Sequence, residues 1–159
     1  MAKVILICGR ICSGKSTYAE ALRRRERAVV LSVDELALAV FDPYLGDKHD
    51  MYMQRVRDYL LKKAVEIVEV GTNVVLDWGF WTRADRDATR AFFAERNIEH
   101  AFHYIDVCDD VWRERIAKRN AAVQAGEAQA YFVDENLAAK FASRFEKPEK
   151  AEMDEWIAE

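Results

Sequence analysis

Short apolar runs alternate along this chain with longer stretches in which apolar residues recur every three or four positions. The runs 4–8, 28–32, 73–76 and 102–105 contain mainly apolar residues and are too short for helices, which is typical of buried strands. Strands that alternate with helical patterns predict an α/β domain with a parallel sheet. We therefore expect a four- or five-stranded parallel sheet flanked by helices, with no clear fifth strand in the pattern.

Capping residues and helix breakers set the expected boundaries of the first helices. A helix is predicted from about residue 15 to residue 25, directly after the first strand. Ser32 and Glu35 form a capping box at the start of a short second helix. A long helix is expected over about 50–70, where Gly71 ends it.

Three further helices are expected in the second half of the chain. Thr82 caps the first of them, and its buried face is expected to consist of Ala84, Ala88, Ala91 and Phe92. The second begins at Asp109 and Asp110 and runs to about residue 120. A polar stretch follows, and apolar residues at four-residue spacing over 137–145 predict the last helix.

The composition is that of one ordinary globular domain spanning residues 1–159. Apolar residues make up 51% of the 159 residues and charged residues 33%, which excludes a disordered or low-complexity chain. The net charge is −4, so the broad positive surface of a nucleic-acid coat is not expected.

The cysteines and the apolar runs indicate where the protein works. Three cysteines without a CxxC pair fit neither a disulfide framework nor a zinc site. No apolar run is long enough for a signal peptide or a membrane span. We therefore expect a cytoplasmic protein that does not associate with membranes.

The clearest chemical signal is the segment between the first strand and the first helix. It reads Gly-Arg-Ile-Cys-Ser-Gly-Lys-Ser over residues 9–16, which fits the phosphate-loop pattern GxxxxGK[ST]. Glycines let consecutive backbone N–H groups point at phosphate oxygens, and the helix N-terminus adds partial positive charge. The residues expected to hold a nucleotide are Gly9, Ile11, Cys12, Ser13, Gly14, Lys15, Ser16 and Thr17.

Two side chains of this loop have defined expected roles. Lys15 would reach the β- and γ-phosphates of ATP, and the Ser16 hydroxyl would ligate Mg²⁺. The plainer alternative is a glycine-rich turn that caps an ordinary helix.

Asp34 follows the second strand and has two interpretations. An acid in the first turn of a helix stabilises that helix whatever else it does. If Asp34 faces the phosphate loop, it can instead orient an acceptor hydroxyl and take its proton during phosphoryl transfer.

An acid that ends a buried strand is a candidate for holding Mg²⁺ in the manner of a Walker-B residue. Asp77 ends the third apolar run and Asp106 ends the fourth. We favour Asp77, because its run is the more continuous and β-branched. The aromatic stretch 78–81 comes directly after it, and either forms a wall of the acceptor site or packs over the sheet.

Arg115 and Arg119 lie four residues apart, on one face of a predicted helix. Two guanidinium groups on one face can clamp a polyphosphate and stabilise a transition state. We expect residues 109–131 to form a mobile lid, the alternative being an ordinary solvated helix face.

The three histidines show no metal-binding spacing.

Taken together, these residues resemble the P-loop kinase family of small phosphotransferases, which includes polynucleotide 5′-hydroxyl kinases, chloramphenicol phosphotransferase and zeta toxins. The stretches 76–81 and 145–149 resemble in particular a bacterial subgroup of AAA-type ATP-binding, kinase-like proteins. The resemblance implies Mg²⁺ and ATP as cofactors and a hydroxyl as acceptor. It makes Asp34 the acceptor-activating carboxylate, Arg115 and Arg119 the lid arginines, and places the adenine near Asn120 and Pro148.

The leading functional hypothesis is an ATP-dependent kinase that phosphorylates a hydroxyl of a small molecule such as a nucleoside, a sugar or an antibiotic. A polynucleotide 5′-hydroxyl kinase is disfavoured, because such kinases usually have an arginine where this chain has Ala37. The third alternative is a nucleotide-binding regulatory protein, or a slow ATPase, with no acceptor.

Overall fold

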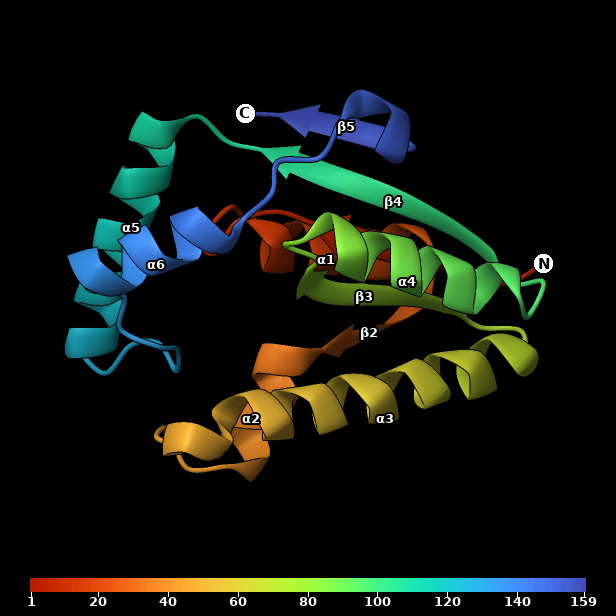
Figure 1. Ribbon diagram of the computed structural model, residues 1–159, viewed down its shortest axis with the longest axis horizontal. Helices are drawn as coiled ribbons and strands as arrows, with labels where there is room; N and C mark the ends of the chain where they lie inside the picture. Colours follow the sequence, from red (N-terminus) through yellow and green to blue (C-terminus); the bar gives the residue numbers. More distant parts are fainter.

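A computed structural model describes all 159 residues, and its centre is a five-stranded sheet. The strands lie in the order β2-β3-β1-β4-β5, and every neighbouring pair is parallel (Figure 1). Their bounds are β1 (Lys3–Cys8), β2 (Ala28–Ser32), β3 (Asn73–Gly79), β4 (Glu99–Asp106) and β5 (Glu155–Ala158).

Six α-helices and two short 3₁₀ helices connect the strands. The α-helices are α1 (Lys15–Arg25), α2 (Val33–Val40), α3 (His49–Glu69), α4 (Arg83–Ala94), α5 (Asp109–Gln124) and α6 (Glu135–Arg144). The 3₁₀ helices are η1 (Gly46–Lys48) and η2 (Lys150–Glu152). None of the helices is both long and apolar enough to cross a bilayer.

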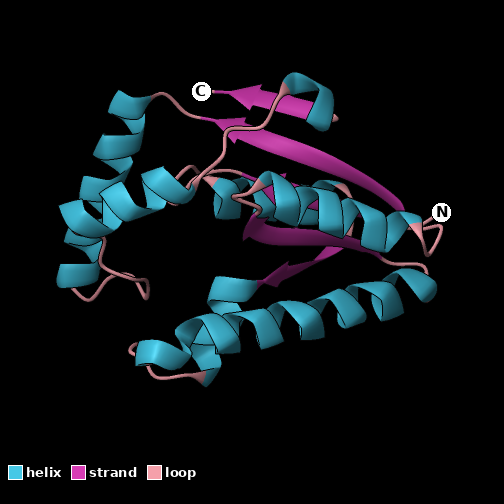
Figure 2. Ribbon diagram, in the orientation of Figure 1, coloured by secondary structure: helices cyan, strands magenta, loops and turns pink.

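The central strand β1 is buried on both of its faces. Its residues 4–8 are at most 1% exposed, which is what helices on both sides of a parallel sheet produce. Ile5 and Ile7 pack into the cluster that includes residues of α1 and α5, whereas Val4 and Leu6 pack into the cluster beneath α3 and α4. The carboxyl ends of the strands all lie at one end of a parallel sheet, and α5 and α6 lie at that end (Figure 2).

The sheet has a fifth strand that the sequence pattern did not reveal. The segment 155–158 pairs with β4 at the edge of the sheet, and Ile157 lies opposite Ile105. The strand is only four residues long, and its burial does not alternate between inside and outside. Its partner supplies the pairing, so the segment carries little strand signal of its own.

The expected buried face of α4 was wrong. Ala84, Ala88 and Ala91 are exposed and Phe92 is half-buried, whereas the residues that α4 buries are Arg86, Thr89 and Phe93. This face has the same helical period but begins two residues later, because α4 turns a charged side chain toward the core. Apolar periodicity cannot identify such a face.

Arg86 is a buried junction between distant parts of the chain. Its Nε donates to Oε1 of Glu152 at 3.0 Å, and the two side chains are only 1% and 6% exposed. Its Nη1 donates to the carbonyl oxygens of Phe80, Trp81 and Glu146. Arg86 thus joins α4 to the end of β3 and to the segment that leads into β5.

We expect Glu152→Gln to lower the free energy of unfolding by about 3 kcal/mol or more at neutral pH, because it leaves a buried guanidinium without its counter-charge. Burial alone would raise the pKa of Glu152, but the hydrogen bonds from Arg86 and from the amide of Glu149 hold that pKa below its usual value. Wild-type protein therefore has this stability above about pH 4.5 and loses it as the pH falls, while the variant lacks it throughout.

Urea unfolding followed by circular dichroism measures both effects. Glu95→Gln is the matched control, because Glu95 is exposed at the end of α4, and it should change the stability by less than about 0.5 kcal/mol. Equal stabilities for the two variants would contradict a stabilising role for the Arg86–Glu152 pair.

Candidate active site

The loop between β1 and α1 has the backbone geometry of an anion cradle. Gly14 adopts a left-handed conformation, with φ of 93°, at the start of α1, a region that glycine reaches without steric cost. A Cβ atom on Gly14 would lie 3.1 Å from Nη1 of Arg115, and one on Gly9 would lie 2.7 Å from Oγ of Ser13. A side chain at Gly9 would therefore displace the Ser13 hydroxyl, and one at Gly14 would crowd the Arg115 guanidinium and strain the backbone.

Lys15 lies over this loop as a partly buried cation. Its Nζ donates to the carbonyl oxygen of Arg10 at 2.7 Å. Burial lowers the pKa of Lys15, and the carboxylates of Asp77 and Asp34 oppose that shift. A cation that has lost part of its hydration is well prepared to bind an anion.

Asp77, rather than Asp106, contacts the loop. Oγ of Ser16 donates to Oδ2 of Asp77 at 2.8 Å, because β3 pairs directly with β1 and places Asp77 opposite Ile7. Burial raises the pKa of Asp77, while the charge of Lys15 and the hydrogen bond from Ser16 lower it.

Asp106 ends β4, which flanks β1 on the side opposite to β3, and its carboxylate has other partners. Its carboxylate accepts hydrogen bonds from Nζ of Lys147 at 3.1 Å and from Nε1 of Trp156 at 3.2 Å. The geometry thus favours Asp77 as the acid beside the phosphate loop.

The pair of Ser16 and Asp77 fits a magnesium ion. Mg²⁺ prefers hard oxygen ligands and is usually held by one or two protein oxygens together with waters and phosphate oxygens. A hydroxyl and a carboxylate within hydrogen-bonding distance of each other, beside the phosphate loop, supply such a set. No group of three or more His, Cys, Asp or Glu side chains forms an alternative metal site.

Arg115 and Arg119 of α5 point at the phosphate loop, whereas Arg113 pairs with Asp110 of the same helix. Nη1 of Arg115 donates to the carbonyl oxygen of Ser13 at 2.8 Å, and its Nη2 pairs with Glu159. Nη1 of Arg119 lies 3.2 Å from Sγ of Cys12. The two guanidinium groups are therefore held beside the loop.

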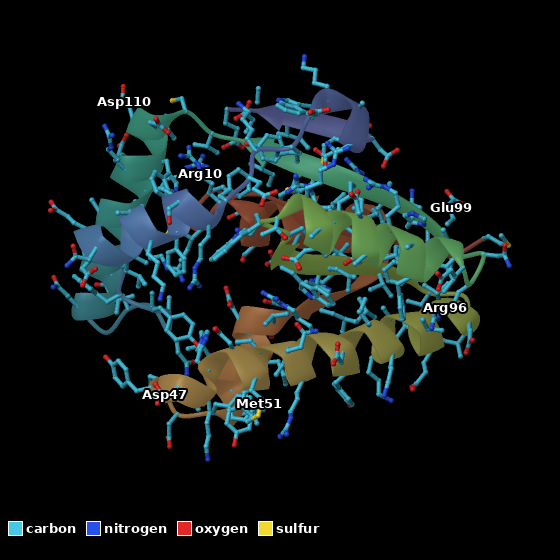
Figure 3. The ribbon with its side chains drawn as sticks, in the orientation of Figure 1. Arg10, Asp47, Met51, Arg96, Glu99 and Asp110 are labelled. Carbon is cyan, nitrogen blue, oxygen red and sulfur yellow. The ribbon has the colours of Figure 1, made fainter.

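The base of α5 is fixed to the same loop. Nε1 of Trp112 donates to the carbonyl oxygen of Ile11 at 2.6 Å. The guanidinium of Arg10 stacks 4.3 Å from the Trp112 ring and donates to Asp109, and Figure 3 shows Arg10 beside α5. No motif in the sequence indicates this contact, because it joins residues about 100 positions apart.

Asn120 holds the chain together farther along α5. Its amide donates to the carbonyl oxygen of Val133 at 2.5 Å and accepts from the amide of Val133 at 2.8 Å. The contact of Asn120 with adenine stays a prediction, and the structure gives its side chain this structural partner.

A cleft of about 1,440 Å³ joins these elements. Lys15, Ser16 and Thr17 line it together with Asp77, and Asp34 lies on its α2 side. The other residues of the lining that matter here are Glu35, Arg115, Arg119, Gln129 and Ala130. The structure thus brings the phosphate loop, the Ser16–Asp77 pair, Asp34, Arg115 and Arg119 to one cavity.

The aromatic stretch after Asp77 does not line this cleft. Trp78 stacks on Phe80 at 5.4 Å between ring centres, and Trp81 packs edge-on against Phe141 of α6 at 5.0 Å. The structure therefore favours the alternative in which these side chains pack over the sheet. The sequence analysis missed Glu35 and Gln129 as residues of the cleft, because neither belongs to a motif.

Comparison with known proteins shows the family of this chain and the proteins that share its fold. A search of curated proteins finds no significant match. Among solved structures, a suspected kinase from Chloroflexus aurantiacus superposes with a TM-score of 0.75 at 19% identity, covering 99% of this chain and 86% of that chain. The APS kinase CysC of Mycobacterium tuberculosis, solved with AMPPNP and APS, has a TM-score of 0.67 at 20% identity, covering 99% and 88%.

A chain of the Pnkp1/Rnl/Hen1 RNA repair complex is a further neighbour, with a TM-score of 0.70 at 21% identity over 90% of this chain and 43% of that chain. At sequence identities this low, the structural similarity shows the fold alone. The AAA_33 family, described as an AAA domain, matches residues 4–148. The chain therefore belongs to the AAA_33 family of AAA domains and has the fold of the P-loop kinases.

Proposed function

We propose that the protein is an ATP-dependent kinase that transfers the γ-phosphoryl group to a hydroxyl of a small molecule. The observation that carries this proposal is the position of Asp34, which lies in the same cleft as the phosphate loop and has no basic partner. The kinase folds among the structural neighbours support it.

The donor nucleotide would bind along the phosphate loop. Backbone N–H groups of the phosphate loop and Nζ of Lys15 would hold the phosphates, with the N-terminus of α1 directed at them. Ser16 and Asp77 would hold Mg²⁺, which neutralises charge on the β- and γ-phosphates when it is bound. The neighbouring CysC structure, solved with AMPPNP, supports ATP as the donor.

Asp34 would act on the acceptor. It accepts the proton of the attacking hydroxyl while that oxygen forms a bond to the γ-phosphorus and the bond between this phosphorus and the β–γ bridging oxygen breaks. ADP leaves with the bridging oxygen. Arg115 and Arg119 lie beside the loop and can stabilise the charge on the transferring oxygens.

The polynucleotide kinase alternative gains support from the structural neighbours in the Pnkp1/Rnl/Hen1 complex. Against it, Ala37 is 2% exposed inside the contact between α2 and α3, so it presents no group to an acceptor phosphate. The acceptor-free ATPase remains the outcome in which Asp34 serves only the first turn of α2.

Two substitutions test the roles of donor and acceptor separately. Asp34→Asn keeps the helix start but removes the base, so phosphoryl transfer should fall about 100-fold or more while ATP affinity stays within a few-fold. Lys15→Ala should abolish both, because it removes the cation at the phosphates. Calorimetry with ATP and a γ-labelled transfer assay against hydroxyl compounds measure the two quantities. An equal loss of binding and transfer in Asp34→Asn would contradict the acceptor role.

Asp77→Asn should weaken Mg²⁺-dependent nucleotide binding about 10- to 100-fold, because it removes the only carboxylate bonded to Ser16. Titration of a fluorescent ATP analogue with and without Mg²⁺ provides the measurement. Asp106→Asn is the matched control, since Asp106 also ends a strand but contacts Lys147 and Trp156. A larger effect at Asp106 would reverse the assignment of the two acids.

Replacing Arg119 by Lys should lower kcat by about tenfold or more and change the KM for ATP less. Lysine keeps the charge but lacks the planar fork that spans two phosphoryl oxygens. Steady-state kinetics with saturating acceptor measures this, and Arg113→Lys is the control on the same helix, because Arg113 is exposed. Normal turnover in Arg119→Lys would contradict a role for Arg119 in the transfer.

A further inference from the structure

Basic residues are missing from two segments of the chain that are far apart in sequence. No lysine, arginine or histidine occurs in residues 28–47 or in residues 120–139. At the frequency of Lys and Arg in the whole chain, 24 in 159, about six would be expected in these 40 positions. The carboxylates in them are Asp34, Glu35, Asp42, Asp47, Glu127, Asp134 and Glu135.

The two segments form opposite sides of the cleft. Asp34, Glu35, Leu38 and Ala39 line it from α2, and Gln129 and Ala130 line it from the connection between α5 and α6. Asp34 is close enough to Tyr131 of that connection to add to the rise of the Tyr131 pKa, which burial mainly causes. Figure 3 shows Asp47 at the tip of the α2–α3 connection, on the side of the molecule where α5 and α6 lie.

Helix capping explains only part of this pattern. Asp34 and Glu35 lie in the first turn of α2, and Asp134 caps α6 by accepting from the amide of Leu137 at 2.7 Å. Such positions favour acids. They do not explain why both sides of one cleft lack any basic residue.

The cations that line the cleft pair with the phosphate loop or with their own helix, and not with residues of α2 or the α5–α6 connection. Lys15, Arg115 and Arg119 contact the backbone or side chains of the phosphate loop, where the donor phosphates would lie. Arg23 is paired with Glu20 of its own helix, at 2.7 Å. The lining that α2 and the α5–α6 connection contribute therefore presents carboxylates, apolar side chains and an amide, and no basic group.

We infer that the acceptor is a hydroxyl compound that carries a protonated amine, of the amino-alcohol or amino-sugar class. The inference rests on the proposed kinase activity and specifies its substrate class. An ammonium group beside Glu35 would gain charge-assisted hydrogen bonds while the neighbouring hydroxyl faces Asp34. A carboxylate or phosphate on the acceptor would meet repulsion from the same side chains.

Three matched pools of hydroxyl compounds test the substrate class with wild-type protein and γ-labelled ATP. One pool holds amino alcohols and amino sugars, including D-glucosamine; the second holds their neutral counterparts, including D-glucose; the third holds the corresponding acids, including D-gluconate. We expect the amine pool to be phosphorylated at least tenfold faster than the other two, with a rate that falls as salt is added.

A charge-reversal variant tests whether the cleft is the cause. Glu35→Lys should lower kcat/KM for the best amine acceptor at least tenfold, relative to its neutral counterpart, and leave the KM for ATP within a few-fold. Glu95→Lys makes the same change on the exposed end of α4 and should leave the preference unchanged. Circular dichroism shows whether each variant is folded.

The outcomes separate this inference from the proposed function. Equal or faster phosphorylation of the neutral or acidic pool overturns the cationic acceptor. A preference for amines that survives Glu35→Lys overturns recognition of the amine by Glu35. Either result leaves the kinase proposal in place. ATP binding without a phosphorylated product in any pool overturns both.

Discussion

The site depends on the position of β1 at the centre of a parallel sheet. Because β3 and β4 flank it and helices cover both of its faces, β1 has no exposed residue from Val4 to Cys8. Its chain must leave the sheet at the carboxyl edge, where the partner strands also end. The phosphate loop, Asp77 and the start of α5 meet there for that reason, and the Ser16–Asp77 hydrogen bond is a direct result of the pairing between β1 and β3.

Features that depend only on residues close together in the sequence were predictable. The phosphate loop needs only its own glycines and Lys15 to be recognised, and the strand–loop–helix order around it confirmed the P-loop kinase fold. The choice of Asp77 over Asp106 rested on the continuity of an apolar run. The Ser16 contact supports that choice, and the metal-binding role itself stays a prediction.

Features that depend on pairing between distant segments were not predictable in the same way. Arg86 is a charged residue with the burial of a core residue, because Glu152 and three carbonyl groups complete its hydrogen bonds. β5 forms a strand because its backbone pairs with the free side of β4. The two basic-free sides of the cleft become one surface only when α2 and the α5–α6 connection lie opposite each other.

Two contacts at different points along α5 constrain the movements that this helix can make. Trp112 binds the carbonyl oxygen of Ile11 near one end of α5, and Asn120 brackets the backbone of Val133 toward the other. The first contact joins α5 to the phosphate loop; the second joins it to the segment before α6. Movement of Arg119 away from the loop would therefore pivot near Trp112 and carry Gln129 and Ala130 with it. In the proposed kinase, release of the donor phosphates and widening of the cleft would then be a single motion.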